Sequence, residues 1–230
     1  MMKRNNFPFS AVLGLNHAKT AILIVLVNPR AGGLLISGPR GIGKSTLMRS
    51  TQELIERPWR DIPVSVTEDR LFGTIDTEKA IYSGQKKLYP GIINEADQGV
   101  LYLDDANLLR EDLLDSILNI AEVGAYQLER DGLSLRCDTS FTVIAAINPE
   151  SGMLSGACLD QFGLFVNVDN IHDENTRVEI LKRTISFEKD CASFCNLWKL
   201  ENEKIKKAIH SAMSLLPKVV VSSAMIQLAS

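Results

Sequence analysis

A glycine-rich loop between an apolar run and a helix-forming run constrains the fold of this chain more than any other feature. Residues 38–45 read GPRGIGKS and fit the pattern G-x-x-x-x-G-K-S/T. Residues 33–38 are apolar enough for a short buried strand, and residues 44–55 carry apolar positions at helical spacing. A strand that enters a helix through such a loop predicts a layered α/β fold whose loop wraps a phosphate group.

This loop predicts a site for ATP bound together with Mg²⁺. Glycines let backbone N–H groups curl around phosphates, and the helix that follows adds its dipole. We expect Lys44 to reach the β- and γ-phosphates and the Ser45 hydroxyl to bind Mg²⁺. The predicted nucleotide-binding residues are Gly38, Pro39, Arg40, Gly41, Ile42, Gly43, Lys44, Ser45 and Thr46.

Two acidic residues at the end of another apolar run, residues 99–106, suit the same chemistry. A phosphate-binding loop works with a carboxylate on a neighbouring strand that organises Mg²⁺. We therefore expect Asp104 to contact Mg²⁺ through water, and Asp105 to lie where a base orients the attacking water. A pair of acids that caps a helix would have the same sequence, so this alternative stays open.

Asn148 ends a further apolar run, residues 141–147, and is a third candidate at the same edge. A polar side chain there can help to position the attacking water beside the γ-phosphate. Asn-Pro is equally a common turn former, and the sequence does not separate the two roles.

Strands alternate with helices along most of the chain, which predicts a mostly parallel five-stranded sheet covered by helices on both faces. Beyond His172 the pattern is only helical. We expect an α/β domain over residues 1–170 and an incomplete helical lid over residues 171–230. The other expected elements are strands at 62–66 and 164–168, helices at 110–124, 173–187 and 197–215, and a hairpin at 126–138 around Asp131-Gly132.

Charge and composition narrow the partners and the location. The formal net charge of −3 gives no electrostatic sign of nucleic-acid binding. The most apolar run, residues 21–27, is too short to span a membrane and predicts a buried helix. The four cysteines are scattered, and Cys191 and Cys195 have no second Cys or His pair nearby, so reduced thiols in the cytosol are expected rather than a zinc site.

Several longer motifs closely resemble the AAA+ ATPase subunit of magnesium chelatase, its I subunit. From about residue 7 to about residue 183, the family's order and spacing are matched by TEDRLFGTIDTEKAI, LYPGIINEADQGVLYLDDANLL, LERDGLSLR, INPESG and LDQFGL. The resemblance implies an AAA+ nucleotide domain with a helix-2 insert within residues 67–98, a pre-sensor hairpin at 126–138 that faces the interior of a ring, and a helical lid.

The resemblance also implies partners. In that family, rings driven by ATP, here expected to be hexamers of this chain, work with a second AAA+ subunit and a large porphyrin-binding subunit. The large subunit inserts Mg²⁺ into protoporphyrin IX, and related cobalt chelatases use similar ATPases. The expected location is the cytosol, or the plastid stroma if the source is a phototrophic eukaryote.

This chain differs from the family's pattern at three positions that are expected to affect the rate of ATP hydrolysis. The family has Asp-Glu where this chain has Asp104-Asp105, and the shorter side chain changes where a water is held. The family has an arginine where this chain has Gln161, a residue expected to act in trans on a neighbour's γ-phosphate. The family's lid carries a further arginine in a Gly-His-Arg context, and residues 171–230 do not contain that motif.

Three functions therefore stay open. The first is the ATPase motor subunit of a tetrapyrrole metal chelatase. The second is a ring subunit that binds nucleotide without hydrolysing it and regulates or docks partners. The third is a related chaperone-like AAA+ ATPase that remodels another protein.

Overall fold

The structure, a computed structural model, describes residues 6–75, 88–130, 133–221, 225 and 227. At its centre is a five-stranded sheet of order β2-β5-β8-β1-β9, in which every pairing is parallel. The strands are β2 (Trp59–Ile62), β5 (Gly99–Leu103), β8 (Phe141–Ile147), β1 (Leu34–Ser37) and β9 (Leu164–Asn167). The predicted five-stranded α/β sheet is confirmed.

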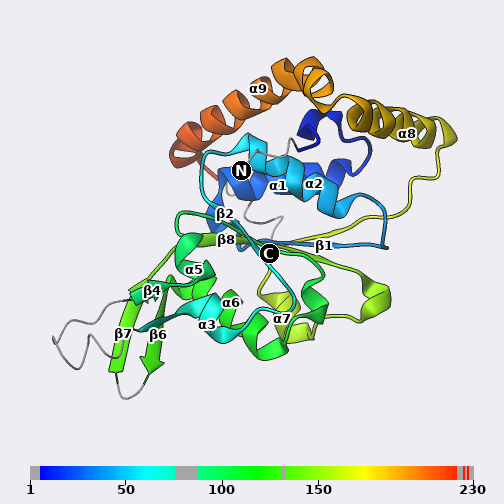
Figure 1. Cartoon of the computed structure of the whole chain (residues 1–230). Helices are drawn as coiled ribbons and strands as arrows, with labels where there is room; N and C mark the ends of the chain where they lie inside the picture. Colours follow the sequence, from blue (N-terminus) through cyan, green and yellow to red (C-terminus); the bar gives the residue numbers. More distant parts are fainter. Residues whose placement is uncertain (1–5, 76–87, 131–132, 222–224, 226, 228–230) are drawn as a thin grey trace.

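Helices cover both faces of this sheet (Figure 1). Leu34 and Ile36 of β1 pack with α1, α2 and α9 on one face, whereas Leu35 packs with the cluster that contains α3, α5, α6 and α7 on the other. Because both faces are buried, the central strands are apolar throughout instead of alternating. The helices on the two faces are α1 (Asn16–Val27), α2 (Lys44–Thr51), α3 (Glu68–Phe72), α5 (Ile92–Glu95), α6 (Glu111–Val123), α7 (Gly156–Asp160) and α9 (Cys191–Leu215).

Short 3₁₀ helices mark the turns between these elements. The 3₁₀ helices among the described residues are η1 (Phe9–Ala11), η2 (Pro29–Ala31), η3 (Gln52–Leu54), η4 (Ala106–Leu108), η5 (Pro149–Ser151) and η6 (Leu216–Lys218). Two of them, η4 and η5, follow β5 and β8 at the edge of the sheet that carries the glycine-rich loop.

One strand begins earlier than the sequence indicates. The sequence predicts an extended run at residues 62–66, but β2 covers Trp59–Ile62. Pro63 has no N–H group to donate to a ladder, and the chain turns there, with Val66 N donating to Pro63 O at 3.0 Å. The apolar residues of that run therefore straddle the end of the strand.

Two antiparallel ribbons extend from the same end of the molecule (Figure 1). The hairpin predicted at 126–138 is confirmed as β6 (Ala125–Arg130) and β7 (Leu133–Asp138), although its turn lies outside the described residues. In the predicted insert, β3 (Gly73–Ile75) pairs with β4 (Leu88–Pro90), and residues 76–87 lie outside the description. The Tyr126 hydroxyl lies 2.7 Å from Phe72 O, which ties the hairpin to the insert.

Two helices complete the described chain, α8 (Glu174–Lys189) and α9. Asp173 and Asp190 cap their amino ends. Arg183 of α8 donates from Nη1 to Ala11 O at 3.0 Å, and its guanidinium carbon lies 4.6 Å from the centre of the Trp198 ring. These contacts connect α8 to both the N-terminal segment and α9.

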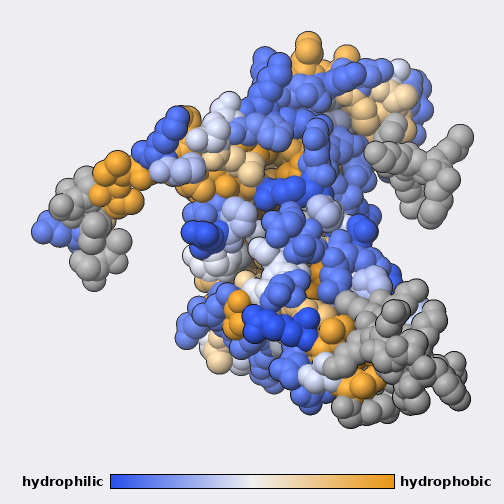
Figure 2. Space-filling view, turned by 90° about the vertical axis from the view of Figure 1, so that its left-hand side faces the viewer, coloured by the Kyte–Doolittle hydropathy of each residue, from blue (hydrophilic) through white to orange (hydrophobic). Residues whose placement is uncertain are grey.

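The surface is largely polar. Figure 2 shows one face on which hydrophilic residues predominate and hydrophobic residues gather in small patches. No helix among the described residues is both long and apolar enough to cross a membrane.

Gly163 directly precedes β9, where the backbone comes too close to the η2 turn for a side chain. A Cβ at this position would lie 1.7 Å from Ala31 O. We expect Gly163→Ala to lower the free energy of unfolding by about 2 kcal/mol, because the start of β9 must move away from the η2 turn. Gly156→Ala is the matched control, since a Cβ at Gly156 would have nothing within 4 Å. Urea unfolding compares the two, and equal midpoints would contradict the close approach.

Candidate nucleotide site

The glycine-rich loop connects the carboxyl end of β1 to the start of α2, as predicted. Gly43 adopts φ 93°, in the left-handed region that favours glycine. A Cβ at Gly38 would lie 2.5 Å from Val168 O, so a side chain is excluded there too. The backbone can therefore curl tightly, with the first N–H groups of α2 free to face a ligand.

Lys44 is buried inside this loop, with 8% of its surface exposed. Its Nζ donates hydrogen bonds to the carbonyl oxygens of Gly38 at 2.5 Å and of Pro39 at 2.9 Å. Burial lowers the pKa of Lys44, while nearby carboxylates, Asp105 most strongly, favour its charged form. An ammonium group held by loop carbonyls is placed to exchange them for phosphate oxygens.

Ser45 and Asp104 meet at the predicted metal position. The Ser45 hydroxyl donates to Asp104 Oδ2 at 2.9 Å, joining the first turn of α2 to the end of β5. One carboxylate and one hydroxyl suffice for Mg²⁺ bound with ATP, because phosphate oxygens and water fill the remaining positions. The described residues contain no group of three or more His, Cys, Asp or Glu side chains that could hold a metal ion.

Asp105 lies beside this pair but in a different backbone state. Its φ is 51° and its ψ is 49°, a left-handed conformation that aspartate tolerates better than most residues. It is exposed at the start of η4, and its charge acts on Lys44. The structure thus brings Asp105 to the site, and its role in orienting water stays a prediction.

Asn148 also lies at this edge, directly after β8. Its Oδ1 accepts from Glu150 N at 3.2 Å, and its Nδ2 donates to Ser151 Oγ at 3.3 Å, so its amide stabilises its own turn. Asn107, in η4, donates to Asn148 O at 3.1 Å. The turn-forming role is therefore present, and a role in positioning water stays a prediction.

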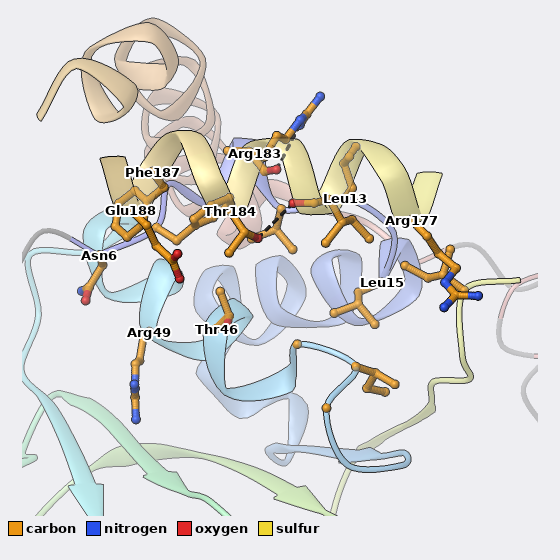
Figure 3. Close-up of a pocket in the computed structure, with 18 of the residues that line it drawn as sticks. Asn6, Leu13, Leu15, Thr46, Arg49, Arg177, Arg183, Thr184, Phe187 and Glu188 are labelled. Carbon is orange, nitrogen blue, oxygen red and sulfur yellow. Dashed lines mark hydrogen bonds between the residues drawn. The ribbon is translucent and has the colours of Figure 1, made fainter. Parts of the chain in front are cut away.

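A cleft of about 1250 Å³ opens beside the loop (Figure 3). Its lining comes from the N-terminal segment, the loop with the start of α2, residues 170–172, and α8 with the first residue of α9. In Figure 3, Leu15 and Thr46 lie below α8, which carries Arg177 and Thr184 above the cleft. A mixed apolar and polar cleft next to a phosphate-binding loop can hold the adenosine half of a nucleotide.

Comparison with known proteins identifies the family. Residues 33–161 match the AAA domain of the dynein-related subfamily. The magnesium-chelatase 38 kDa subunit of Rhodobacter capsulatus is 35% identical, over 93% of this chain and 70% of that protein. The magnesium-chelatase subunit ChlI homolog of Methanocaldococcus jannaschii is 32% identical, over 100% of this chain and 73% of that protein. The chain belongs to the magnesium-chelatase I-subunit family.

A solved structure supports the same placement. A chain of the magnesium-chelatase BchI–BchD complex, built on a single-particle cryo-EM reconstruction, superposes with a TM-score of 0.68 at 35% identity. The match covers 94% of this chain and 77% of that chain. The resemblance inferred from the motifs and the AAA+ fold that it implied are both confirmed.

In this member of the magnesium-chelatase I-subunit family, Gln161 lies far from its own loop. It directly follows α7 and precedes β9, at the amino ends of the strands, whereas the loop lies at their carboxyl ends. The side chain is exposed, and its Nε2 donates to Ala157 O at 3.5 Å. The candidate catalytic residues thus separate into Asp105 and Asn148 at the loop and Gln161 at the opposite edge.

The sequence did not single out three residues that the structure places at the candidate nucleotide site. The charge of Glu150, like those of Asp105 and Asp104, opposes the lowering of the Lys44 pKa by burial. Asn107 bonds the loop after β5 to the turn after β8. The buried Tyr102 hydroxyl has a raised pKa, from burial first and then from Asp104. Of the three, only Tyr102 could have been found from the sequence. It precedes Asp104 by two residues, and alternate residues of a strand share a face, so the pattern places the two side chains on the same side of the sheet.

Proposed function

We propose that this chain is a Mg·ATP-binding AAA+ subunit of a tetrapyrrole metal chelatase. It would use ATP hydrolysis to drive insertion of a metal, expected to be magnesium, into protoporphyrin IX by a partner subunit. The observation that carries the proposal is the Ser45–Asp104 hydrogen bond of 2.9 Å beside the buried Lys44, in a chain 35% identical to a magnesium-chelatase subunit.

Each residue of the site has a stated task in this proposal. The backbone of residues 38–46 and the Lys44 ammonium bind the phosphates, and Ser45 and Asp104 hold Mg²⁺, which neutralises phosphate charge. Asp105 orients the attacking water as a base. The cleft under α8 takes the adenosine half, so that the lid at residues 171–230 responds to the presence of nucleotide.

The proposal includes a ring. Gln161 lies at the edge of the sheet opposite to the loop, so it can serve only a neighbour's site, which supports a homo-oligomeric ring, expected to be a hexamer. The partners are a second AAA+ subunit, as in the related BchI–BchD complex, and a large porphyrin-binding subunit. The domain division at residue 170 and the cytosolic location remain predictions.

Steady-state Mg²⁺-dependent ATP hydrolysis over a range of protein concentrations tests the proposal. Turnover per subunit should rise with concentration, because each complete site is shared between two subunits. Metal insertion with the other chelatase subunits then separates a chelatase motor from a chaperone-like ATPase. Nucleotide binding without turnover at any concentration would reject the motor function.

A second function, nucleotide binding without rapid hydrolysis, is favoured by one observation. Asp105 stands where the family has glutamate and is one methylene shorter, so it would hold the attacking water less well. We expect Asp105→Glu to raise kcat by up to about 10²-fold with little change in nucleotide affinity, because a misplacement near 1 Å can cost that much. Asp105→Asn is the control and should lower kcat; an unchanged rate in both variants would remove Asp105 from catalysis.

A further inference from the structure

A groove of about 620 Å³ lies at the amino ends of β1 and β8, on the opposite edge of the sheet from the nucleotide loop. We call it the amino-end groove. The η2 turn, the end of α6 and the start of β8 line it together with Asp160 and Gln161. Arg30, in the η2 turn, is part of the same lining.

The backbone holds Arg30 close to Gln161. Gly163 N donates to Gly32 O at 2.8 Å, and the Cβ that Gly163 lacks would touch Ala31. Arg30 precedes Gly32 by two residues, and Gln161 precedes Gly163 by two. Each residue therefore lies within about 7 Å of chain from this contact, and both line the amino-end groove.

Arg30 carries the charge that Gln161 lacks, and that charge is uncommitted. Its side chain is exposed, and within the described part of the chain its guanidinium makes no ion pair or hydrogen bond. Asp160 and Glu122 line the same groove, yet neither forms an ion pair with Arg30 among the described residues. The guanidinium is therefore free to meet an anion that approaches this edge from outside.

We propose that Arg30 supplies to a neighbouring subunit's nucleotide the positive charge that the position of Gln161 lacks. The inference rests on the proposed function, because it needs a ring in which the amino-end groove of one subunit faces the nucleotide loop of the next. Hydrolysis forms a bond from the water oxygen to the γ-phosphorus, while the bond from that phosphorus to the bridging oxygen breaks and its electron pair leaves with ADP. The proton of the water passes to the Asp105 carboxylate and from there to solvent. Arg30 gains and loses no proton; it stabilises the charge on the transferring phosphoryl group.

Arg30→Ala is the direct test. We expect kcat for ATP to fall by about 10³-fold, the scale at which an arginine supplied in trans acts in phosphoryl transfer. Binding of a fluorescent ATP analogue at each subunit's own loop should stay unchanged. Arg60→Ala, which removes an exposed arginine on the far edge strand β2, is the matched control and should keep the parent kcat.

Assembly provides a readout that does not depend on turnover. In sedimentation velocity, ADP with aluminium fluoride should convert the parent and Arg60→Ala to the larger assembly, because Arg30 bridges two subunits through the phosphoryl mimic. Arg30→Ala should not convert. Gln161→Arg, added to Arg30→Ala, should restore both turnover and assembly, because it returns an arginine to the same groove.

Mixing two inactive variants shows whether Arg30 acts in trans. Lys44→Ala has an impaired loop but a normal Arg30, and Arg30→Ala has a normal loop. An equimolar mixture should regain activity at about one interface in four, where an intact loop faces an intact Arg30. A mixture as inactive as its components would overturn action in trans.

Failure of this inference and failure of the proposed function are distinguishable. If the parent hydrolyses ATP and Arg30→Ala matches it, only the assignment of Arg30 is wrong. If the parent binds nucleotide but does not hydrolyse it, both the motor function and the role of Arg30 in hydrolysis are wrong, whereas the nucleotide site stands. If the parent binds no nucleotide, the proposed function itself is rejected and the inference falls with it.

Discussion

Lys44→Ala is expected to weaken binding of Mg·ATP by roughly 10²-fold or more, equivalent to about 3 kcal/mol. Lys44 is the one loop side chain that the structure holds buried with its ammonium among loop carbonyls, at 2.5 and 2.9 Å. Alanine removes the charge that phosphates would meet there and leaves the loop backbone intact. Titration with a fluorescent ATP analogue measures the change, with hydrolysis as a second readout.

The fold of this variant should survive, which makes the result interpretable. Burial lowers the pKa of Lys44, so the charged form is less favourable in the folded chain than in the unfolded one. Alanine relieves this cost of burial but also removes the two hydrogen bonds to loop carbonyls, so the two effects oppose each other and we expect only a small change in melting temperature. Lys199→Ala, an exposed lysine on α9, is the control and should bind nucleotide as the parent does. Tight binding by Lys44→Ala would reject the phosphate-binding role of the loop.

Asp104→Asn is expected to reduce Mg²⁺-dependent hydrolysis by at least about 10²-fold and to raise the Mg²⁺ concentration needed for half-maximal rate. The amide keeps the size of the carboxylate and can still accept the hydrogen bond from Ser45, now 2.9 Å from Asp104 Oδ2. It lacks the negative charge that attracts a divalent cation. The effect should therefore fall on the metal and spare the fold.

A Mg²⁺ titration of the hydrolysis rate distinguishes this from a general defect. Asp61→Asn is the control, because Asp61 lies on the neighbouring strand β2 and accepts from Trp59 Nε1 at 2.8 Å, a bond that an amide oxygen can keep. It should retain the Mg²⁺ dependence of the parent. The same Mg²⁺ requirement in Asp104→Asn and the parent would remove Asp104 from the metal site.

The amino-acid sequence by itself determined the elements that depend on neighbours along the chain. Short runs of residues encode the loop at 38–45, the apolar strands at 99–103 and 141–147, and the hairpin at 126–138. They do so because the conformational freedom of glycine, the burial of a strand and the spacing of apolar residues are local properties. Its error at residues 62–66 has the same origin, since a run of apolar residues does not show on which side of Pro63 the strand pairs.

Only the tertiary structure decided which distant residues meet. The strand order β2-β5-β8-β1-β9 brings Asp104 to Ser45 across 59 residues of sequence. The cleft under α8 joins four separate segments, and the amino-end groove places Arg30 beside Gln161. The loop motif and the acids after the second apolar run predicted the first of these meetings, because they belong to one known chemistry. The other two depend on strand pairing and helix packing between remote parts of the chain, for which the local pattern of residues carries no signal.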